Sequence, residues 1–221
     1  MPTLALIPVR SFENGKSRLA GVLDRESRAG LVRSMLAQVM RSTLDSGVVE
    51  RVLVVSPDPD VLDFARAFDR RIEPIEQPSN QPGLNTAVTF GRDRAIALGA
   101  DRLLIMFADL PALTPDDVRL LASNPTAVVI ATDWHGTGTN GMLLRFDEEG
   151  ARQFTFQYGP ESGHLHAAEA DRLGLRVATV VIDGLAIDLD TPEDFDALAA
   201  SGRNLPDWLP AALDRRQEMS A

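Results

Sequence analysis

The sequence predicts a three-layer α/β/α domain built around a mostly parallel, Rossmann-like sheet. Short apolar runs of strand length alternate with longer segments of helical spacing along most of the 221 residues. This alternation is typical of parallel sheets with helices on both faces. Hydrophobic residues make up 44% of the chain, enough for a full core, and an aromatic fraction of 5% means that aliphatic side chains fill it.

The expected strands are short runs rich in Val, Ile, Leu and Ala, and turn or polar residues bound most of them. They are 4–9, 51–56, 71–75, 103–107, 127–131, 142–145 and 175–182. The expected helices carry apolar residues three or four positions apart, which places them on one face. They are 25–46, 60–68, 84–98, a segment that begins after Thr114, 162–173 and 191–200. Thr114 is followed by Pro115, Asp116 and Asp117, a combination that favours a helix start.

We expect a single domain over residues 1–203 and a tail over 204–221, which is broken by prolines and amphipathic. The tail is expected to pack on the body or on a partner subunit. The formal net charge of −10 argues against a nucleic-acid partner, which would need a basic face. The absence of Cys, of a signal-peptide pattern and of a long apolar run predicts a cytoplasmic protein with no membrane partner.

Lys16 is the only lysine among 22 basic residues. A chain that uses Arg elsewhere keeps Lys where a compact point charge is needed. Lys16 lies with Arg10 and Arg18 in a loop after the first expected strand, and three cations there suit a triphosphate. The segment fails the P-loop pattern because Arg10 stands where a second Gly is required. A solvated basic loop is the alternative.

Carboxylates follow two expected strands, at the edge of the sheet where ligands bind. Asp109 follows the strand 103–107, and Asp188 and Asp190 follow the last strand. Mg²⁺ prefers a few hard oxygen ligands of this kind and shares the rest with substrate phosphates. The alternative for Asp190 is a helix cap, a role that either Asp190 or Thr191 would fill.

Two further segments attract attention. Residues 136–141 match Gly-x-Gly-x-x-Gly, but they precede a strand rather than a helix, so a dinucleotide site is not expected. Their backbone amides can approach an anion, although a plain loop remains possible. In 158–166, Ser162 is expected to cap a helix, whose amides would then face an anion. A zinc site at His164 and His166 is disfavoured because residues two apart on a helix do not share a face.

The chain resembles the CofC/FbiD family of 2-phospho-L-lactate or phosphoenolpyruvate guanylyltransferases, which act in the biosynthesis of the deazaflavin coenzyme F-420. The resemblance covers about residues 4–200 in order. The motifs that carry it are Lys-Ser-Arg-Leu-Ala (16–20), Gly-Leu-Asn (83–85), Ala-Asp-Leu-Pro (108–111), Gly-Thr-Gly-Thr-Asn (136–140), Gly-Pro-x-Ser (159–162) and Asp-Leu-Asp-Thr-Pro-Glu-Asp (188–194). It implies the nucleotide-diphospho-sugar transferase (GT-A-like) type of fold.

The resemblance implies roles for individual residues. GTP would contact Pro8, Val9, Arg10, Lys16, Arg18, Gly83, Leu84 and Asn85. Asp109, Asp188 and Asp190 would hold Mg²⁺, and Lys16 and Asp109 would be catalytic. Thr139, Gly159 and Ser162 would bind the acceptor, a small phosphorylated acid such as phosphoenolpyruvate, 2-phospho-L-lactate or 3-phosphoglycerate. The acceptor phosphate would attack the α-phosphorus of GTP and release pyrophosphate. A homodimer and transfer of the product to the next enzyme of the pathway are also expected.

Glu161 and Gly163 depart from the family pattern, which commonly has Gly at the first position and a bulkier residue at the second. Both lie beside the expected acceptor residues, so the identity of the acid is open. The alternatives are another nucleotidyltransferase of the same fold, of the molybdenum-cofactor or sugar-phosphate type, and a non-catalytic nucleotide-binding domain. A nucleotidyltransferase of the molybdenum-cofactor type normally has a Gly-Gly-rich loop after the first strand, which this chain lacks before Lys16.

Overall fold

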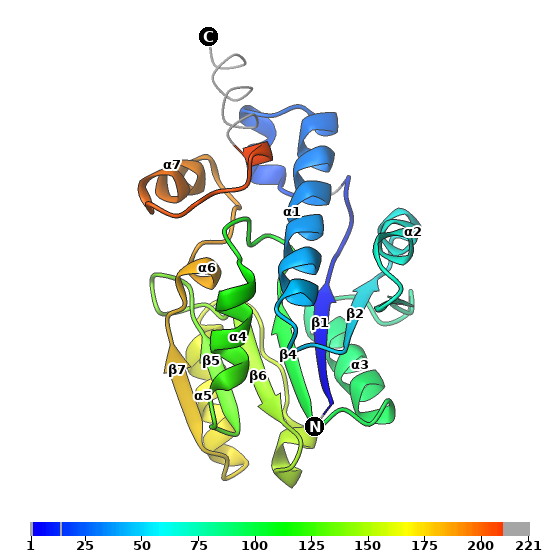
Figure 1. Cartoon of the computed structure of the whole chain (residues 1–221), viewed down its shortest axis with the longest axis vertical. Helices are drawn as coiled ribbons and strands as arrows, with labels where there is room; N and C mark the ends of the chain where they lie inside the picture. The colour runs from blue at the N-terminus through cyan, green and yellow to red at the C-terminus, as the bar shows by residue number, and fades with distance from the viewer. Residues whose placement is uncertain (1, 14, 210–221) are drawn as a thin grey trace.

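The computed structural model describes residues 2–13 and 15–209 and has a seven-stranded sheet with the order β3-β2-β1-β4-β6-β5-β7 (Figure 1). The strands are β1 Thr3–Pro8, β2 Arg51–Ser56, β3 Ile72–Glu76, β4 Arg102–Met106, β5 Val128–Ala131, β6 Gly141–Arg145 and β7 Val177–Val180. All seven correspond to expected strands. The central strands are almost completely buried, as expected for apolar runs covered on both faces.

The sheet is mostly parallel, as predicted. β1 pairs in parallel with β2 and β4, β2 with β3, and β5 with β7. Only β6 is antiparallel to its neighbours β4 and β5, and Gly141 at its start pairs with Met106 and Ala131 at their ends. Because β6 runs in the opposite direction, the loop before it lies at the same edge of the sheet as the residues that follow β4. The sequence had not predicted this reversal.

The α-helices are α1 Arg25–Asp45, α2 Pro59–Phe68, α3 Leu84–Ala97, α4 Pro115–Ser123, α5 Ser162–Arg172, α6 Asp183–Ala186 and α7 Pro192–Ala200. Two 3-10 helices, η1 Ser17–Gly21 and η2 Glu149–Gln153, complete the described elements. The sequence pattern did not predict η1, η2 or α6. These elements have four or five residues, too few to show a helical period.

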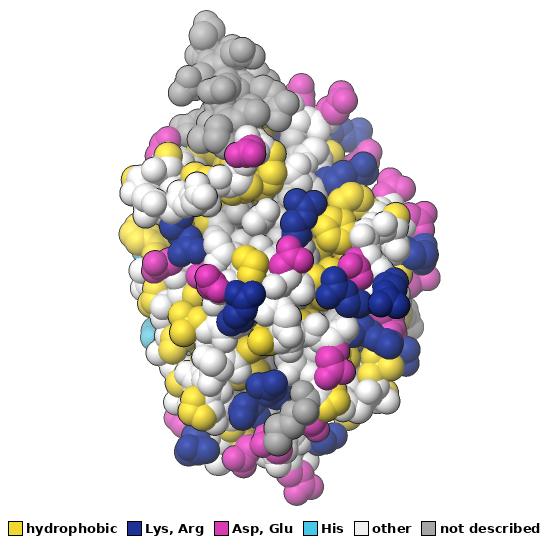
Figure 2. Space-filling view, in the orientation of Figure 1, with side chains coloured by type: hydrophobic (Ala, Val, Ile, Leu, Met, Phe, Trp, Pro, Cys, Tyr) yellow, Lys and Arg dark blue, Asp and Glu magenta, His cyan; other side chains and the backbone are white. Residues whose placement is uncertain are grey.

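Helices cover both faces of the sheet, which confirms the three-layer prediction (Figure 1). Buried residues of α1, α2, α4 and α7 form one core with one face of the sheet. Buried residues of α3 and α5 form a second core on the opposite face. On the side of the molecule shown in Figure 2, basic and acidic side chains are interspersed rather than separated into patches.

The starts of α4 and α7 agree with the sequence signals. Thr114 accepts a hydrogen bond from the Asp117 amide at 3.3 Å, and the Asp117 carboxylate accepts one from the Thr114 amide at 2.9 Å. This reciprocal pair is a capping box, and it confirms the helix start that the sequence predicts at Thr114. A second capping box joins Thr191 and Asp194 at the start of α7. Thr191 is therefore the N-cap residue of α7, and Asp190 precedes it.

The segment after α7 packs back on the body as far as it is described. Arg203 donates a hydrogen bond to Asp117 at 2.6 Å, Leu209 is buried, and Leu205 and Trp208 pack against the core on the α1 side. Residues 210–221 of the expected tail lie outside the described residues. Within 2–13 and 15–209, none of the helices combines the length and the hydropathy of a transmembrane segment.

Candidate active site

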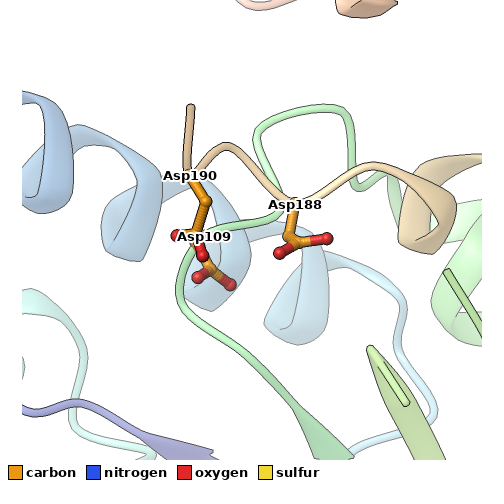
Figure 3. Close-up of side chains that lie close together, drawn as sticks. All are labelled: Asp109, Asp188 and Asp190. Carbon is orange, nitrogen blue, oxygen red and sulfur yellow. The ribbon is translucent and has the colours of Figure 1, made fainter. Parts of the chain in front are cut away.

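Three aspartates converge beyond the carboxyl end of β4. Asp109 follows that strand, and Asp188 and Asp190 lie in the segment between α6 and α7. The two segments are held together by a backbone hydrogen bond from the Leu189 amide to the Asp109 carbonyl oxygen at 3.0 Å. As Figure 3 shows, the side chains lie close together, and one carboxylate oxygen from each lies within 4.8 Å of the others. The sequence prediction that these three residues form one site is consistent with this geometry.

The electrostatics of this aspartate cluster favour a cation. Burial and the negative charge of Asp109 raise the pKa of the Asp188 carboxyl above its usual value, although a hydrogen bond from Asn140 opposes the shift. The Asn140 side chain donates from Nδ2 to Asp188 Oδ1 at 3.1 Å and to the Leu185 carbonyl oxygen at 2.9 Å, and these two bonds fix its orientation. Asp109 Oδ1 is buried and has no hydrogen-bond partner among the described residues. Three converging carboxylates with an uncommitted oxygen form a donor set that suits Mg²⁺.

Lys16 enters the aspartate cluster directly. Its ammonium nitrogen lies 2.6 Å from Asp109 Oδ2 and 2.6 Å from Asp190 Oδ1, and its side chain is only 8% exposed. Burial alone would lower the pKa of Lys16, but the two carboxylates more than offset it, so the pKa lies above its ordinary value and the ammonium stays charged. The sequence analysis placed Lys16 near phosphates and did not foresee these ion pairs, which join residues far apart in the chain.

The backbone of Lys16 is also unusual. Lys16 precedes η1 and adopts a left-handed conformation with φ of 54° and ψ of 42°. A non-glycine residue in this region carries strain of about 1 kcal/mol or more, and such strain clusters at functional sites. The three cations of this loop are not equivalent. Unlike Lys16, the Arg18 side chain is 73% exposed, and its guanidinium comes no closer than 4.0 Å to the Asp190 carboxylate. Arg10 is exposed as well.

A cavity of about 660 Å³ lies beyond the carboxyl ends of β1 and β2. It is lined by Pro8, Val9, Arg10, Pro57, Gln77, Pro78, Ser79, Pro82, Gly83, Leu84 and Ala87. Five of the eight expected nucleotide-binding residues belong to this lining, whereas Lys16 and Arg18 lie at the aspartate cluster and Asn85 does not line it. The loop 77–83 contributes much of the wall.

Two amide side chains shape this region. Gln77 is buried and donates to the carbonyl oxygens of Gln81 at 2.8 Å and Gly83 at 3.0 Å, which holds the loop closed on itself. The side chain of Asn85 is committed to the backbone of Tyr158: Nδ2 donates to its carbonyl oxygen at 3.2 Å, and Oδ1 accepts from its amide at 2.7 Å. Asn85 therefore joins the start of α3 to the segment before α5.

The expected acceptor residues come together from two segments. The Gly163 amide donates to the Thr137 carbonyl oxygen at 2.9 Å, which ties the start of α5 to the loop before β6. The Ser162 amide donates to the Gly159 carbonyl oxygen at 3.2 Å and closes a tight turn. Thr139 lies in the loop before β6, next to the Asn140 that contacts Asp188. Thr139, one of the expected acceptor residues, is thus next in sequence to a residue that contacts the aspartate cluster.

The expectation that Ser162 caps α5 was wrong. The N-cap residue is Glu161, which has a left-handed φ of 60°, and Ser162 is the first residue of the helix. The Glu161 carboxylate turns to His164, at 2.9 Å from Nδ1, and both side chains are exposed. Glycine at position 163 has a steric explanation, because a Cβ there would lie 3.1 Å from the carbonyl oxygens of Gly138 and Thr137.

His166 makes two hydrogen bonds in this region that the sequence did not predict. It is completely buried, whereas His164 is exposed, so the two do not share a face, as the sequence predicts. His166 Nδ1 lies 3.1 Å from Thr139 Oγ1, and Nε2 accepts a hydrogen bond from the Gln157 amide at 2.9 Å. An isolated histidine in a helix carries no sequence signal for such a link.

The loop before β6 uses several of its amides internally. The Thr137 amide donates to Asp133 Oδ1 at 2.9 Å, and the Gly136 amide donates to the Asp133 carbonyl oxygen at 3.0 Å. The Asn140 amide donates to Ala131 at 2.9 Å. The expected anion-binding role of this glycine-rich run is therefore restricted to the few positions around Thr139. The run precedes the strand β6, as the sequence predicts, and not a helix.

Comparison with known proteins identifies similar sequences. The family model described as "Guanylyl transferase CofC like" matches residues 3–205. The chain is 43% identical over 208 residues to a phosphoenolpyruvate guanylyltransferase of Rubrobacter xylanophilus, covering 91% of this chain and 96% of that protein. It is 39% identical over 202 residues to a protein of the same name from Conexibacter woesei, covering 90% and 87% of the two chains.

Solved structures share the fold at low sequence identity. A putative nucleotide-diphospho-sugar transferase from Desulfovibrio desulfuricans superimposes with a TM-score of 0.76 at 17% identity, covering 99% of this chain and 97% of the other. A 4-diphosphocytidyl-2C-methyl-D-erythritol synthase has a TM-score of 0.63 at 16% identity, with 90% and 97% covered. These similarities support the fold prediction.

Proposed function

Because the chain belongs to the CofC-like guanylyl transferase family, we propose that it transfers the guanylyl group of GTP to the phosphate of phosphoenolpyruvate, with release of pyrophosphate. The observation that carries the proposal is the buried ammonium of Lys16, paired with two carboxylates of the aspartate cluster, at the same edge of the sheet as a cavity of about 660 Å³. The names of the relatives from Rubrobacter and Conexibacter favour phosphoenolpyruvate among the phosphorylated acids. The product would then enter the biosynthesis of the deazaflavin coenzyme.

The cavity would hold the guanosine part of GTP. Its walls are largely apolar, with Pro8, Val9, Pro57 and Leu84 among them, so they suit the faces of a base and a ribose. Arg10 lies on the wall and is exposed, so its guanidinium would pair with phosphate oxygens. The adjacent aspartate cluster and Lys16 would then receive the triphosphate.

Asp109, Asp188 and Asp190 would hold Mg²⁺. The uncommitted and buried Asp109 Oδ1 is a ready ligand, and the raised pKa of Asp188 reflects a site that favours additional positive charge. The bound ion would neutralise phosphate charge during the reaction. Asn140 would keep the Asp188 carboxylate in its orientation, because the hydrogen bond to the Leu185 carbonyl holds the amide in place.

The residues of the chain would act by positioning and by charge. A phosphate oxygen of the acceptor forms a bond to the α-phosphorus of GTP, the bond from that phosphorus to the bridging oxygen of the β-phosphate breaks, and pyrophosphate leaves. Lys16, which stays protonated, would stabilise the charge that accumulates on the phosphoryl oxygens. Thr139, Gly159 and Ser162 would hold the acceptor phosphate or carboxylate beside it. No protein nucleophile is required, so correct alignment supplies much of the rate.

Pyrophosphate release by the purified chain tests the proposal. The assay contains GTP and Mg²⁺ with phosphoenolpyruvate, 2-phospho-L-lactate or 3-phosphoglycerate in separate reactions. GTP without acid, and ATP or CTP with each acid, serve as controls. We expect release with GTP and phosphoenolpyruvate together and a product whose mass equals the acid plus one guanylyl group. Silence with every acid, or equal release with ATP, would overturn the proposal.

A further inference from the structure

We propose that His166 is a positioning residue that turns the hydroxyl of Thr139 into a hydrogen-bond donor for the phosphorylated acid. This inference rests on the proposed function and adds to it a determinant of acceptor binding. Its basis is the chain of hydrogen bonds from the Gln157 amide through the imidazole of His166 to Thr139 Oγ1. His166 is completely buried and would act through Thr139.

The direction of these hydrogen bonds follows from their donors. A backbone amide can only donate, so His166 Nε2 must be the acceptor of the bond from Gln157. In a neutral imidazole the other nitrogen then carries the proton, and Nδ1–H donates to Thr139 Oγ1. The imidazole is neutral at physiological pH because burial lowers the pKa of His166 to about 4, against the opposing charge of Glu169.

The proton of the Thr139 hydroxyl has no acceptor among the described side chains and backbone groups. Thr139 is 4% exposed, and His166 is the only hydrogen-bond partner of Oγ1 among the residues that the structure describes. A buried donor that is not satisfied is costly, so this proton favours an acceptor atom from a bound molecule. Phosphate and carboxylate oxygens of a phosphorylated acid accept and do not donate. The opposite tautomer of His166 would consume this proton and present lone pairs to the acid.

The surroundings of His166 keep the imidazole in this orientation. Its ring packs edge-to-face on Tyr158 at 4.6 Å between centroids, and the rings of Phe154 and Phe156 lie 5.8 and 6.5 Å away. His166 thereby connects the segment before Gly159 to the loop that carries Thr139. Both segments contribute expected acceptor residues, so the imidazole would set the spacing of the acceptor site together with the direction of one donor.

Two substitutions separate the hydrogen bonds of His166. In His166→Asn, the side-chain amide nitrogen would lie near the position of Nδ1 and can still donate to Thr139. In His166→Gln, the longer side chain would place its amide near the position of Nε2, toward Gln157. We expect His166→Gln to raise the KM for phosphoenolpyruvate about tenfold, as for a lost hydrogen bond to a charged group. The KM for GTP should stay unchanged, and His166→Asn should retain much of the affinity for the acid. Thermal unfolding shows that each variant is folded.

A cycle with Thr139→Val distinguishes positioning from packing. Valine keeps the shape of threonine and removes the hydroxyl, so Thr139→Val alone should raise the KM for phosphoenolpyruvate as His166→Gln does. If His166 acts through that hydroxyl, His166→Gln should have no further effect on this KM in the Thr139→Val background. The same tenfold rise in that background, or equal rises in the KM values for GTP and the acid, would overturn the inference.

The tautomer is measured independently of turnover. The chain has three histidines, so ¹⁵N-histidine labelling gives few signals, and the spectrum of His166→Asn assigns that of His166. We expect a protonated Nδ1 and an unprotonated Nε2 in the wild type, and a protonated Nε2 would overturn the inference. If the wild-type chain releases no pyrophosphate with any acid, the proposed function fails, whereas the spectrum still decides the hydrogen-bond direction on which the inference depends.

Discussion

The ammonium nitrogen of Lys16 lies 2.6 Å from Asp190 Oδ1, although 174 positions separate the two residues in the chain. The same nitrogen also lies 2.6 Å from Asp109 Oδ2, in a second ion pair. One buried cation therefore balances two of the three carboxylates proposed to hold Mg²⁺. The proposed metal ligands and the proposed catalytic cation share one site, so a change at either is expected to affect the other.

Lys16→Arg should lower kcat by about 100-fold, the effect of losing one well-aligned donor to transition-state charge. The planar guanidinium keeps the charge but does not fit between two carboxylates in a site where the lysine side chain is 8% exposed. Overpacking should destabilise the fold by about 1 to 3 kcal/mol, which circular dichroism and thermal unfolding measure. Arg66→Lys, at an exposed ion pair on α2, is the matched control and should leave kcat unchanged. Equal kcat values for Lys16→Arg and the wild type would contradict the proposed role.

Asp188→Asn should weaken the binding of a divalent cation by about tenfold or more, because a ligand charge is lost while the size of the side chain is kept. Electron paramagnetic resonance of Mn²⁺, used as a substitute for Mg²⁺, measures this affinity without turnover. Asp183→Asn is the control, since Asp183 is 82% exposed and its described ion pair is with Arg203. The same Mn²⁺ affinity in wild type and Asp188→Asn would argue against a metal at the aspartate cluster.

Stability should fall as the pH decreases from about 6.5 to 4, owing to His166. Burial lowers the pKa of His166 to about 4 in the folded chain, below its ordinary value of 6.5, so the unfolded chain binds more protons across this window. The stabilisation is fully present above pH 6.5, and its loss should reach about 3 kcal/mol near pH 4. Thermal unfolding of wild type and His166→Asn measures it, and the variant should show a flatter profile.

Other groups should be distinguishable in this experiment. The Glu169 carboxylate, hydrogen-bonded by Arg172, has a pKa lowered to about 2, so its contribution is present above its ordinary pKa of 4.5 and is lost below that value. Its window therefore lies below that of His166. His164→Asn is the control because His164 is exposed. A wild-type profile that is flat between pH 6.5 and 4 would contradict the burial of a neutral His166.

Glu161→Gly should stabilise the fold by about 1 kcal/mol relative to Glu161→Ala, because only the glycine adopts a left-handed backbone without strain. Both variants remove the exposed side-chain contact with His164, so their difference isolates the φ of 60° at position 161. Denaturant unfolding measures the two free energies of unfolding. If the alanine variant were as stable as the glycine variant, the backbone at this position would not be strained.

Much of the fold was predictable because its signals are local. The buried strands are continuous apolar runs, and the capping boxes at Thr114 and Thr191 are recognisable in four residues. The antiparallel direction of β6 was not predictable, since apolar residues in a short strand give no information about its direction. That reversal brings Thr139 to the edge of the sheet that carries Asp109, so part of the site depends on a feature without a sequence signal.

The site was predictable in its components and not in its connections. The positions of Asp109, Asp188 and Asp190 after strands suggested one metal site, and the described geometry places them together. The ion pairs of Lys16 and the link from His166 to Thr139 are long-range contacts, which depend on the folded arrangement of segments far apart in sequence. Asn85 shows the same limit, because both of its amide atoms are committed to the backbone of Tyr158.

The single buried lysine has a practical consequence for chemical labelling. Because the 221 residues contain no other lysine, an amine-directed reagent can modify only Lys16 and the amino terminus. Acylation of Lys16 would remove the charge that the two carboxylates surround, so the extent of its modification would report how accessible the centre of the site is. Protection of this one amine by added nucleotide or metal would therefore measure occupancy by mass spectrometry, without any engineered probe.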